Sequence, residues 1–277
     1  MRKPVFLFAM LLCCTLAAAG ELSQPQTDRF APLDSLLNVF YTSLEMEDVD
    51  EKNAQADFLI GTCRDSLTRQ HVALSIFEHY RYSRVMGEEA VAIHVYDEWF
   101  KAGKVSFRGE FDEMDAEVFV RFNRSSLIGA DAQAVTLFKP CGGTFTIPRP
   151  GHSALLFFYD TGCAKCKIEF QFLPQVLEKV DFDLDVFLVN SSANADKREW
   201  RRLRRSFKVQ NRHLDIVHLW DPGRESGFEF AYGVIATPRI FVVEPGGTII
   251  GRRLELENLP QMFGIAGAIQ ATYDKYR

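Results

Sequence analysis

The sequence has few of the residues that build metal sites and only a small net charge. It contains 6 cysteines and 6 histidines in 277 residues, and the histidines are scattered rather than paired. A structural zinc site needs four Cys or His ligands at close spacing, which this pattern does not supply. We therefore expect no metal and no other cofactor. The net charge of −5 argues against nucleic acid and against an anionic membrane surface as partners.

Long hydrophobic runs are also missing, apart from one short run near the N-terminus. Arg2 and Lys3 precede an apolar stretch at 5–16, and small residues follow it at 17–20. This order is typical of a secretory signal peptide over residues 1–20, because the run is too short to span a bilayer. A lipid anchor through Cys13 or Cys14 is less favoured, since neither follows a small residue. The sequence thus predicts an exported protein, whose other cysteines lie where disulfides can form.

The rest of the chain has two different textures. Up to about residue 126, apolar residues recur every three or four positions, as in amphipathic helices. After residue 129, short β-branched and aromatic runs alternate with helical stretches. We predict a helical domain over residues 21–128 and an α/β domain over residues 129–277. The helices predicted in the first domain lie at 36–44, 67–80, 90–100 and 112–122.

Two continuous apolar runs in the second domain predict strands that are buried on both faces of a sheet. They are ALLFFY at 154–159 and VFLVN at 186–190. The segment 164–180 between them has helical spacing, so the unit is β-α-β with a right-handed crossover. The other elements predicted here are a hairpin of 134–139 with 144–147, a hairpin of 240–243 with 248–254, and helices at 197–207 and 259–276.

Cys163 and Cys166 lie between the first of these strands and the helix. The unpaired N–H groups and the positive dipole end at a helix start stabilise a thiolate. Cys163 is therefore predicted to be a nucleophile near neutral pH, and Lys165 and Lys167 add positive charge. Cys166, one helical turn later, is placed to attack a mixed disulfide on Cys163 and release the product. The pair predicts a redox-active disulfide.

Two other interpretations of this C-x-x-C pair stay open. In one, the pair is half of a zinc site, which the absence of a second ligand pair in the sequence disfavours. In the other, it is a static disulfide on a scaffold that binds partners without turnover. The position at a helix start disfavours the second interpretation, because cysteines there are poised for exchange.

A proline lies directly before the predicted strand at 240–243. Pro238 removes a hydrogen-bond donor from the sheet ladder at this point. A cis Thr237–Pro238 bond would turn the chain and leave the preceding backbone available to an incoming peptide. An ordinary trans proline at a strand start is the alternative. Beside a C-x-x-C pair we favour the cis form, and we predict that Thr237 and Pro238 contact the cysteines and bind substrate.

From about residue 131 onward, the chain resembles the TlpA/ResA group of exported bacterial thiol–disulfide oxidoreductases. The resemblance rests on the hairpin before ALLFFY, on CAKCKIEF at 163–170, on the insertion after 190 and on ATPRIFVVEPGGTII at 236–250. It implies a thioredoxin-like α/β fold, with a central mixed sheet flanked by helices. It also implies exchange with protein thiols in the periplasm, with reduction as the favoured direction and a membrane thiol protein as electron donor. The N-terminal helices resemble, more weakly, a domain that precedes such folds.

The resemblance also implies a role for Glu169, which follows the second cysteine by three residues. A glutamate at this position often lies near the disulfide in that group, so Glu169 is predicted to accept the proton of Cys166; a solvated helix carboxylate is the alternative. The chain departs from the group at Gly162, where Trp usually precedes the first cysteine. It departs again at Ala164-Lys165, where a proline-containing dipeptide is usual. Both differences leave the redox potential and the client range open.

Two cysteines and one basic run have no place in this scheme. Cys63 and Cys141 either form a structural disulfide between the two domains or are buried thiols, since cysteine packs as a small hydrophobe. The basic run at 197–205 is either a solvated helix face or a docking surface for an acidic partner.

Overall fold

The computed structural model describes residues 29–193 and 196–265, and the chain divides into two compact units, residues 1–120 and 121–277. The predicted signal peptide lies outside the described residues. Within the described residues, no helix combines the length and the apolar character needed to cross a bilayer.

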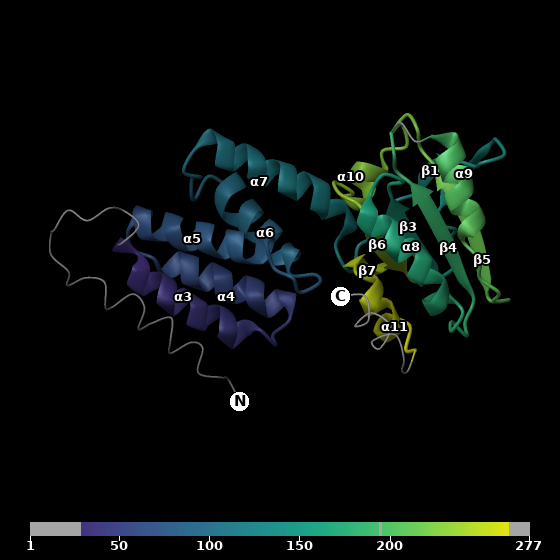
Figure 1. The fold of residues 1–277 in the computed structure, drawn as a ribbon. Helices are drawn as coiled ribbons and strands as arrows, with labels where there is room; N and C mark the ends of the chain where they lie inside the picture. The colour runs from purple at the N-terminus through teal and green to yellow at the C-terminus, as the bar shows by residue number, and fades with distance from the viewer. Residues whose placement is uncertain (1–28, 194–195, 266–277) are drawn as a thin grey trace. The chain divides into compact units, whose positions relative to one another are not determined.

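The first unit is helical, as the sequence predicts (Figure 1). Its apolar helix faces enclose a core that includes Leu37, Leu59 and Phe77, each almost fully buried. Phe77 makes edge-on contacts with Phe100 and Phe119 at ring-centroid distances of 6.0 Å. The elements are α3 (Ala31–Leu44), α4 (Val49–Thr62), α5 (Ser66–Arg81), α6 (Glu89–Val95), the π-helical η2 (Tyr96–Lys101) and most of α7 (Glu110–Asn123).

Helix α4 is the one helix of this unit that the sequence analysis missed among the described residues. Its buried face mixes Lys52 and Gln55 with Ala56, Leu59 and Ile60, so the continuous apolar stripe by which a helix is recognised in a sequence is interrupted. Lys52 of α4 is 4% exposed. Its ammonium group lies 2.6 Å from the carboxylate of Glu88, so the buried charge is compensated by an ion pair.

The second unit is built on one mixed sheet with the strand order β2-β1-β5-β4-β3-β6-β7. β3, β4 and β5 run parallel, and β6 is antiparallel to β3. Every residue of β3 and β4 is buried, as expected for strands covered on both faces. The strands are β1 (Val135–Phe138), β2 (Thr144–Ile147), β3 (Ala154–Tyr159), β4 (Leu184–Asn190), β5 (Leu214–Trp220), β6 (Arg239–Val243) and β7 (Ile249–Leu254).

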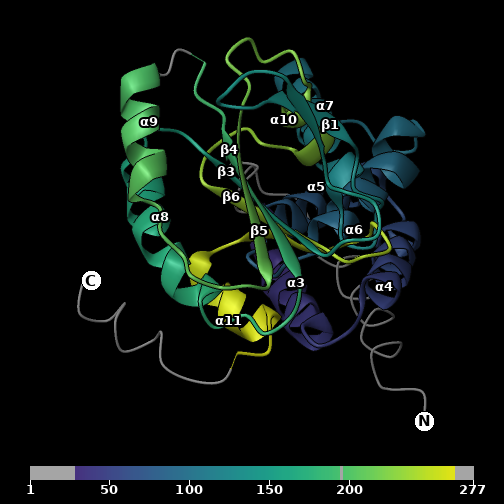
Figure 2. The same cartoon turned by 90° about the vertical axis from the view of Figure 1, so that its right-hand side faces the viewer.

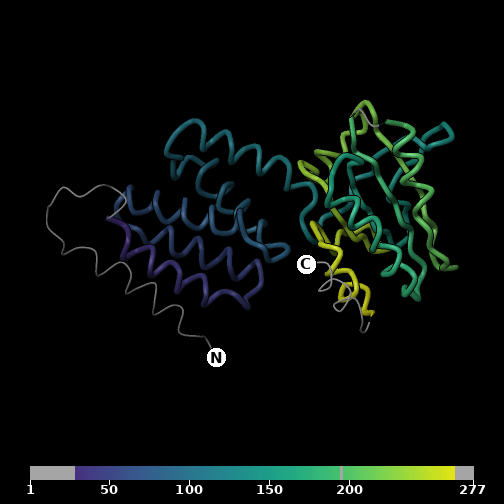
Figure 3. Tube along the Cα trace, viewed as in Figure 1, coloured from purple at the N-terminus to yellow at the C-terminus, as the bar shows by residue number. Residues whose placement is uncertain are grey.

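Helices cover both faces of this sheet (Figure 2). α8 (Ala164–Leu177), α9 (Lys197–Ser206) and α11 (Leu259–Met262) lie on one face, and α10 (Phe228–Tyr232) lies on the other. Figure 3 follows the chain through β3, α8 and β4, the predicted β-α-β unit. The predicted α/β class, the central mixed sheet and the preceding helices are confirmed.

The second unit differs from the prediction at β5, α10 and α11, and in the unpredicted 3-10 helices η3 (Arg124–Ser126) and η4 (Leu256–Asn258). β5 and α10 were not predicted, because β5 is only partly buried and α10 is a single short turn. The helix predicted over 259–276 ends at Met262, where Gly264 adopts a left-handed conformation with φ 65°. The part of that prediction beyond residue 265 lies outside the described residues.

The second unit begins within the last turn of α7, whereas the sequence analysis placed the domain boundary between residues 128 and 129. Phe122 stacks on Phe230 with ring centroids 4.7 Å apart. Asn123 accepts a hydrogen bond from the buried guanidinium of Arg252 at 3.1 Å, and Ser125 donates to the carbonyl of Phe230 at 2.6 Å. These contacts tie the end of α7 to the sheet unit.

Candidate active site

Cys163 lies where the chain leaves β3 and enters α8. It is the N-cap residue of α8, and its sulfur accepts a hydrogen bond from the N–H of Cys166 at 3.2 Å. The preceding loop is fixed by two bonds: the Gly162 N–H donates to the Asp160 carboxylate at 2.6 Å, and the Thr161 N–H donates to Ser192 Oγ at 3.0 Å. Cys163 itself is only partly buried, so these bonds hold a residue that is not enclosed by the protein.

Cys166 lies one helical turn further on, beneath the surface. Its side chain is 1% exposed and packs in the apolar cluster under α8. Burial raises the pKa of the Cys166 thiol above its ordinary value, because the thiolate would lose its hydration. The two cysteines therefore have different environments, the first only partly buried and the second enclosed.

Glu169 is buried in the same helix, with 4% of its side chain exposed. Burial raises its pKa from 4.5 to about 7, and the nearby ammonium of Lys165 opposes the shift. Lys165 Nζ lies 3.6 Å from Glu169 Oε1, whereas Oε2 has no hydrogen-bond partner within the described residues. The alternative of a solvated helix carboxylate is therefore wrong for this structure.

Lys165 lies between the two cysteines and connects Glu169 to the surface. Its ammonium also pairs with the carboxylate of Glu255, a side chain that is 54% exposed. The two carboxylates raise the pKa of Lys165 against the effect of its partial burial. The dipeptide between the two cysteines is Ala164-Lys165. Its lysine lies between the buried carboxylate of Glu169 and the exposed carboxylate of Glu255.

The Thr237–Pro238 bond is cis, and it lies beside the cysteines. The thiol of Cys163 is within 3.6 Å of the carbonyl oxygen of Thr237, to which it donates. Arg239 follows, and its guanidinium donates to the carbonyl of Pro238 at 3.2 Å. The predicted geometry of this segment is confirmed, and its role in substrate binding stays a prediction.

The remaining cysteines are far from one another in the chain and differ in exposure. Cys63 is 4% exposed, and its thiol donates to the carbonyl of Leu59 at 3.4 Å. Cys141 is exposed in the turn between β1 and β2. Both are thiols in the structure, and the Cys63–Cys141 disulfide stays a prediction. Across the described parts of the chain, no group of three or more His, Cys, Asp or Glu side chains is arranged to hold a metal ion.

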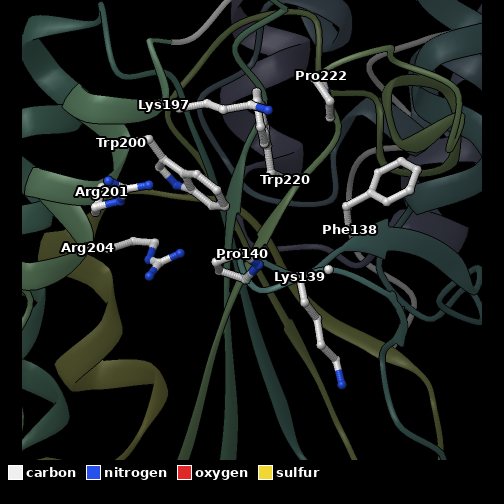
Figure 4. Close-up of a pocket in the computed structure, with 10 residues that line it drawn as sticks. Phe138, Lys139, Pro140, Lys197, Trp200, Arg201, Arg204, Trp220 and Pro222 are labelled. Atoms are coloured by element: carbon white, nitrogen blue, oxygen red, sulfur yellow. The ribbon is translucent and has the colours of Figure 1, made fainter.

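A pocket of about 370 Å³ lies near the start of α9 and was missed by the sequence analysis (Figure 4). Its lining comes from three separate segments: α9, the end of β1 with the β1–β2 turn, and the end of β5 with Pro222, two residues further on. Only the basic run of α9 was noticed in the sequence. Sequence reasoning had no signal that the other two segments meet it.

Comparison with known proteins confirms the fold. No family model matches the chain, and no curated protein matches it. A thioredoxin-like protein from Bacteroides caccae is similar over 96% of this chain and 95% of its own, with 13% identity and a TM-score of 0.67. The thioredoxin domain of a thiol-disulfide oxidoreductase from Bacteroides vulgatus matches 49% of this chain and 94% of its own, with 20% identity and a TM-score of 0.41. A thiol:disulfide interchange protein from a Bacteroides species matches 55% and 99%, with 19% identity and a TM-score of 0.40.

The first of these similarities extends over both units of the chain. It shows a thioredoxin-like fold preceded by helices, which is the fold that the resemblance noted in the sequence implies.

Proposed function

We propose that the protein is an exported thiol–disulfide oxidoreductase that acts on protein thiols in the bacterial periplasm. The observation that carries the proposal is the arrangement of Cys163. The residue is only partly buried at the start of α8, and its sulfur accepts the Cys166 N–H and lies beside the Thr237 carbonyl. A partly exposed cysteine at a helix start, with a second cysteine one turn behind it, is suited to exchange rather than to a static link.

In the favoured direction, the reduced protein donates two electrons to a client disulfide. The Cys163 thiolate attacks one client sulfur, a Cys163–client disulfide forms, and the first client thiolate leaves. Cys166 then attacks the Cys163 sulfur and releases the second client thiolate. The Cys163–Cys166 disulfide remains, and an external thiol protein at the membrane reduces it for the next cycle.

Glu169 accepts the proton that Cys166 must lose before its attack. The burial of Cys166 disfavours its thiolate, so a nearby base is needed for this step. Cys166 and Glu169 are three residues apart on α8 and both point into the protein, which places them on one helix face. With a pKa of about 7, Glu169 is ionised in a large fraction of molecules at neutral pH.

Thr237 and Pro238 hold the client chain beside the nucleophile. Since the Thr237 carbonyl lies 3.6 Å from Cys163 Sγ, an extended client segment that presents its disulfide to Cys163 passes along this backbone. Thr237 is partly buried and Pro238 is buried. Main-chain hydrogen bonds to the Thr237 backbone bind peptides with little dependence on their sequence. This suits a protein with several clients.

The proposal is tested with a peptide disulfide that fluoresces when it is reduced, mixed with the dithiothreitol-reduced protein after the reductant is removed. We expect wild type to reduce about one equivalent of disulfide, because one dithiol carries two electrons. Cys163→Ser should be inactive, and Cys141→Ser, which removes an exposed thiol in the β1–β2 turn, should retain full activity. Activity that survives Cys163→Ser, or a wild-type protein that binds the peptide without reducing it, would favour a non-catalytic binding protein on this fold.

A further inference from the structure

The pocket beside α9 is open to the surface and strongly cationic. Lys197, Arg201 and Arg204 line it from α9, and Lys139 lines it from the β1–β2 turn. Figure 4 shows the α9 side chains on one side of the hollow and Phe138 and Pro222 on the other, with Trp220 between them. No acidic side chain belongs to its lining.

None of the four cations has an ion-pair partner in the described ranges 29–193 and 196–265. The single carboxylate of α9 is Glu199, and it is already paired with Lys167 of α8 at 3.1 Å. The chain as a whole carries a net charge of −5, so this positive charge is local rather than general. A concentrated field of one sign attracts and orients partners of the opposite sign.

The floor of the pocket is aromatic. The rings of Trp200 and Trp220 lie 5.1 Å apart at an angle of 45°. Arg204 Cζ lies 4.9 Å from the Trp200 ring centroid, and Lys197 Nζ lies 5.6 Å from that of Trp220. These cations rest on ring faces, which positions them without neutralising their charge.

The pocket and the cysteines lie at the same edge of the sheet. Tyr159, Asn190 and Trp220 are register partners at the ends of the parallel strands β3, β4 and β5. Neighbouring strands are about 4.8 Å apart, which puts Trp220 two such steps from the strand that leads to Cys163. Trp200 Nε1 also donates to Tyr159 Oη at 2.9 Å, which joins the pocket floor to β3 directly.

We propose that this cationic pocket docks an acidic segment of a partner protein, namely the protein whose thiols or disulfide react with Cys163. The inference rests on the proposed function, which supplies the reason for a partner at this edge. Lys139, Lys197 and Arg201 are exposed at the rim, an arrangement that offers several separate contacts to carboxylates along a chain. Small ligands, in contrast, are bound by being largely enclosed.

Binding is tested first without any redox chemistry. The full-length protein is titrated with a cysteine-free peptide of consecutive glutamates and with the same peptide made of glutamines, at low salt, by calorimetry and tryptophan fluorescence. We expect the glutamate peptide alone to bind, and its binding to weaken as salt shortens the screening length. Equal binding of both peptides, or of neither, would overturn the proposal. Displacement of the peptide by an equal concentration of inorganic phosphate would overturn it as well, since the pocket would then be a simple anion site.

The position of the site is tested with matched pairs of variants on the same helix. Lys197→Gln with Arg201→Gln removes two charges from the pocket, and Arg198→Gln with Arg202→Gln removes two exposed charges of α9 that do not line it. Exposed ion pairs each contribute modestly, so we expect the first pair to weaken binding about three- to tenfold and the second pair to have little effect. The same loss in both would mean that only the overall charge of α9 attracts the peptide.

The link to exchange is tested by placing one disulfide in each peptide. We expect the reduced protein to reduce the glutamate version faster than the glutamine version, and the Lys197→Gln, Arg201→Gln variant to lose this preference while keeping the glutamine rate. If neither disulfide is reduced although the glutamate peptide binds, the proposed oxidoreductase function has failed and the acidic docking site stands without it. If the wild-type protein reduces the glutamate and glutamine peptides at equal rates, the docking of an exchange partner is overturned and the oxidoreductase function is left intact.

Discussion

At the scale of single residues, the cysteine pair and its proton acceptor were not equally visible in the sequence. Cys163 and Cys166 stand out because a C-x-x-C after a buried strand is a specific pattern. Glu169 was singled out only through the resemblance, since a glutamate on a helix is usually solvated. Its burial depends on the packing of α8 against the sheet, which no local pattern in the sequence reports.

Glu169 should give the resolution step a characteristic pH dependence. The carboxylate must be ionised to accept the Cys166 proton, so the rate of client release should rise as pH rises through about 7 and level off above it. In Glu169→Gln this rise should disappear, and the rate near pH 8 should fall about a hundredfold, the typical loss of a general base. Stopped-flow measurement of client thiol release from the mixed disulfide checks both.

The matched control is Glu178→Gln, which changes an exposed glutamate at the end of the same helix. It should leave the profile as in wild type. A Glu169→Gln variant that keeps the rise near pH 7 would show that another group takes the proton.

At the scale of elements, strands and helices with continuous or periodic apolar residues were predicted well. β3, β4 and α8 follow directly from such runs. α4 was missed because its buried face includes Lys52 and Gln55, and β5 because it is only partly buried. Both depend on partners distant in the chain, such as Glu88 for Lys52.

Gly233, at the end of α10, marks a close approach between elements. Its φ is 65°, and a Cβ there would lie 2.0 Å from the carbonyl oxygen of Phe122. Gly227, at the start of α10, has φ 71° and nothing within 4 Å of a Cβ. Alanine at Gly227 should therefore lower the free energy of unfolding by about 1–2 kcal/mol, the cost of the left-handed conformation alone.

Gly233→Ala should lower the free energy of unfolding clearly more than Gly227→Ala does, because the backbone must also move away from the carbonyl of Phe122. Urea unfolding of the two variants, followed by circular dichroism, measures the difference. Equal losses would mean that the end of α7 is not held against Gly233 in solution.

At the scale of the whole molecule, the order of the elements along the chain was predictable, but the tertiary contacts between distant elements were not. The β-α-β unit predicts two parallel strands joined by a right-handed crossover. The thioredoxin-like arrangement of the whole sheet was implied only by the resemblance. The last turn of α7 belongs to the second unit because of contacts to Phe230 and Arg252, more than a hundred residues away. The lining of the cationic pocket likewise comes from three segments that are separate in the chain. The sequence alone indicates only one of them, the basic run of α9.

The Cys63–Cys141 disulfide, one of the two alternatives for these cysteines, also belongs to this scale. It would close a loop of nearly eighty residues and add about 4 kcal/mol by restricting the unfolded chain. Mass mapping of the exported protein without reductant distinguishes the two alternatives, because a disulfide gives one peptide pair joined through these cysteines. Alkylation of both thiols under the same conditions would show that no disulfide joins the two units.

The central claim, that Cys163 attacks and Cys166 resolves, is tested most directly by trapping the mixed disulfide. Cys166→Ser is incubated with a peptide disulfide, quenched with acid and mapped by mass spectrometry, with Cys163→Ser in parallel. The account predicts a stable adduct of one peptide on Cys163 in the first variant and no adduct at Cys166 in the second, because the Cys166 thiol is buried. An adduct on Cys141 in place of Cys163, or none in Cys166→Ser, would contradict it.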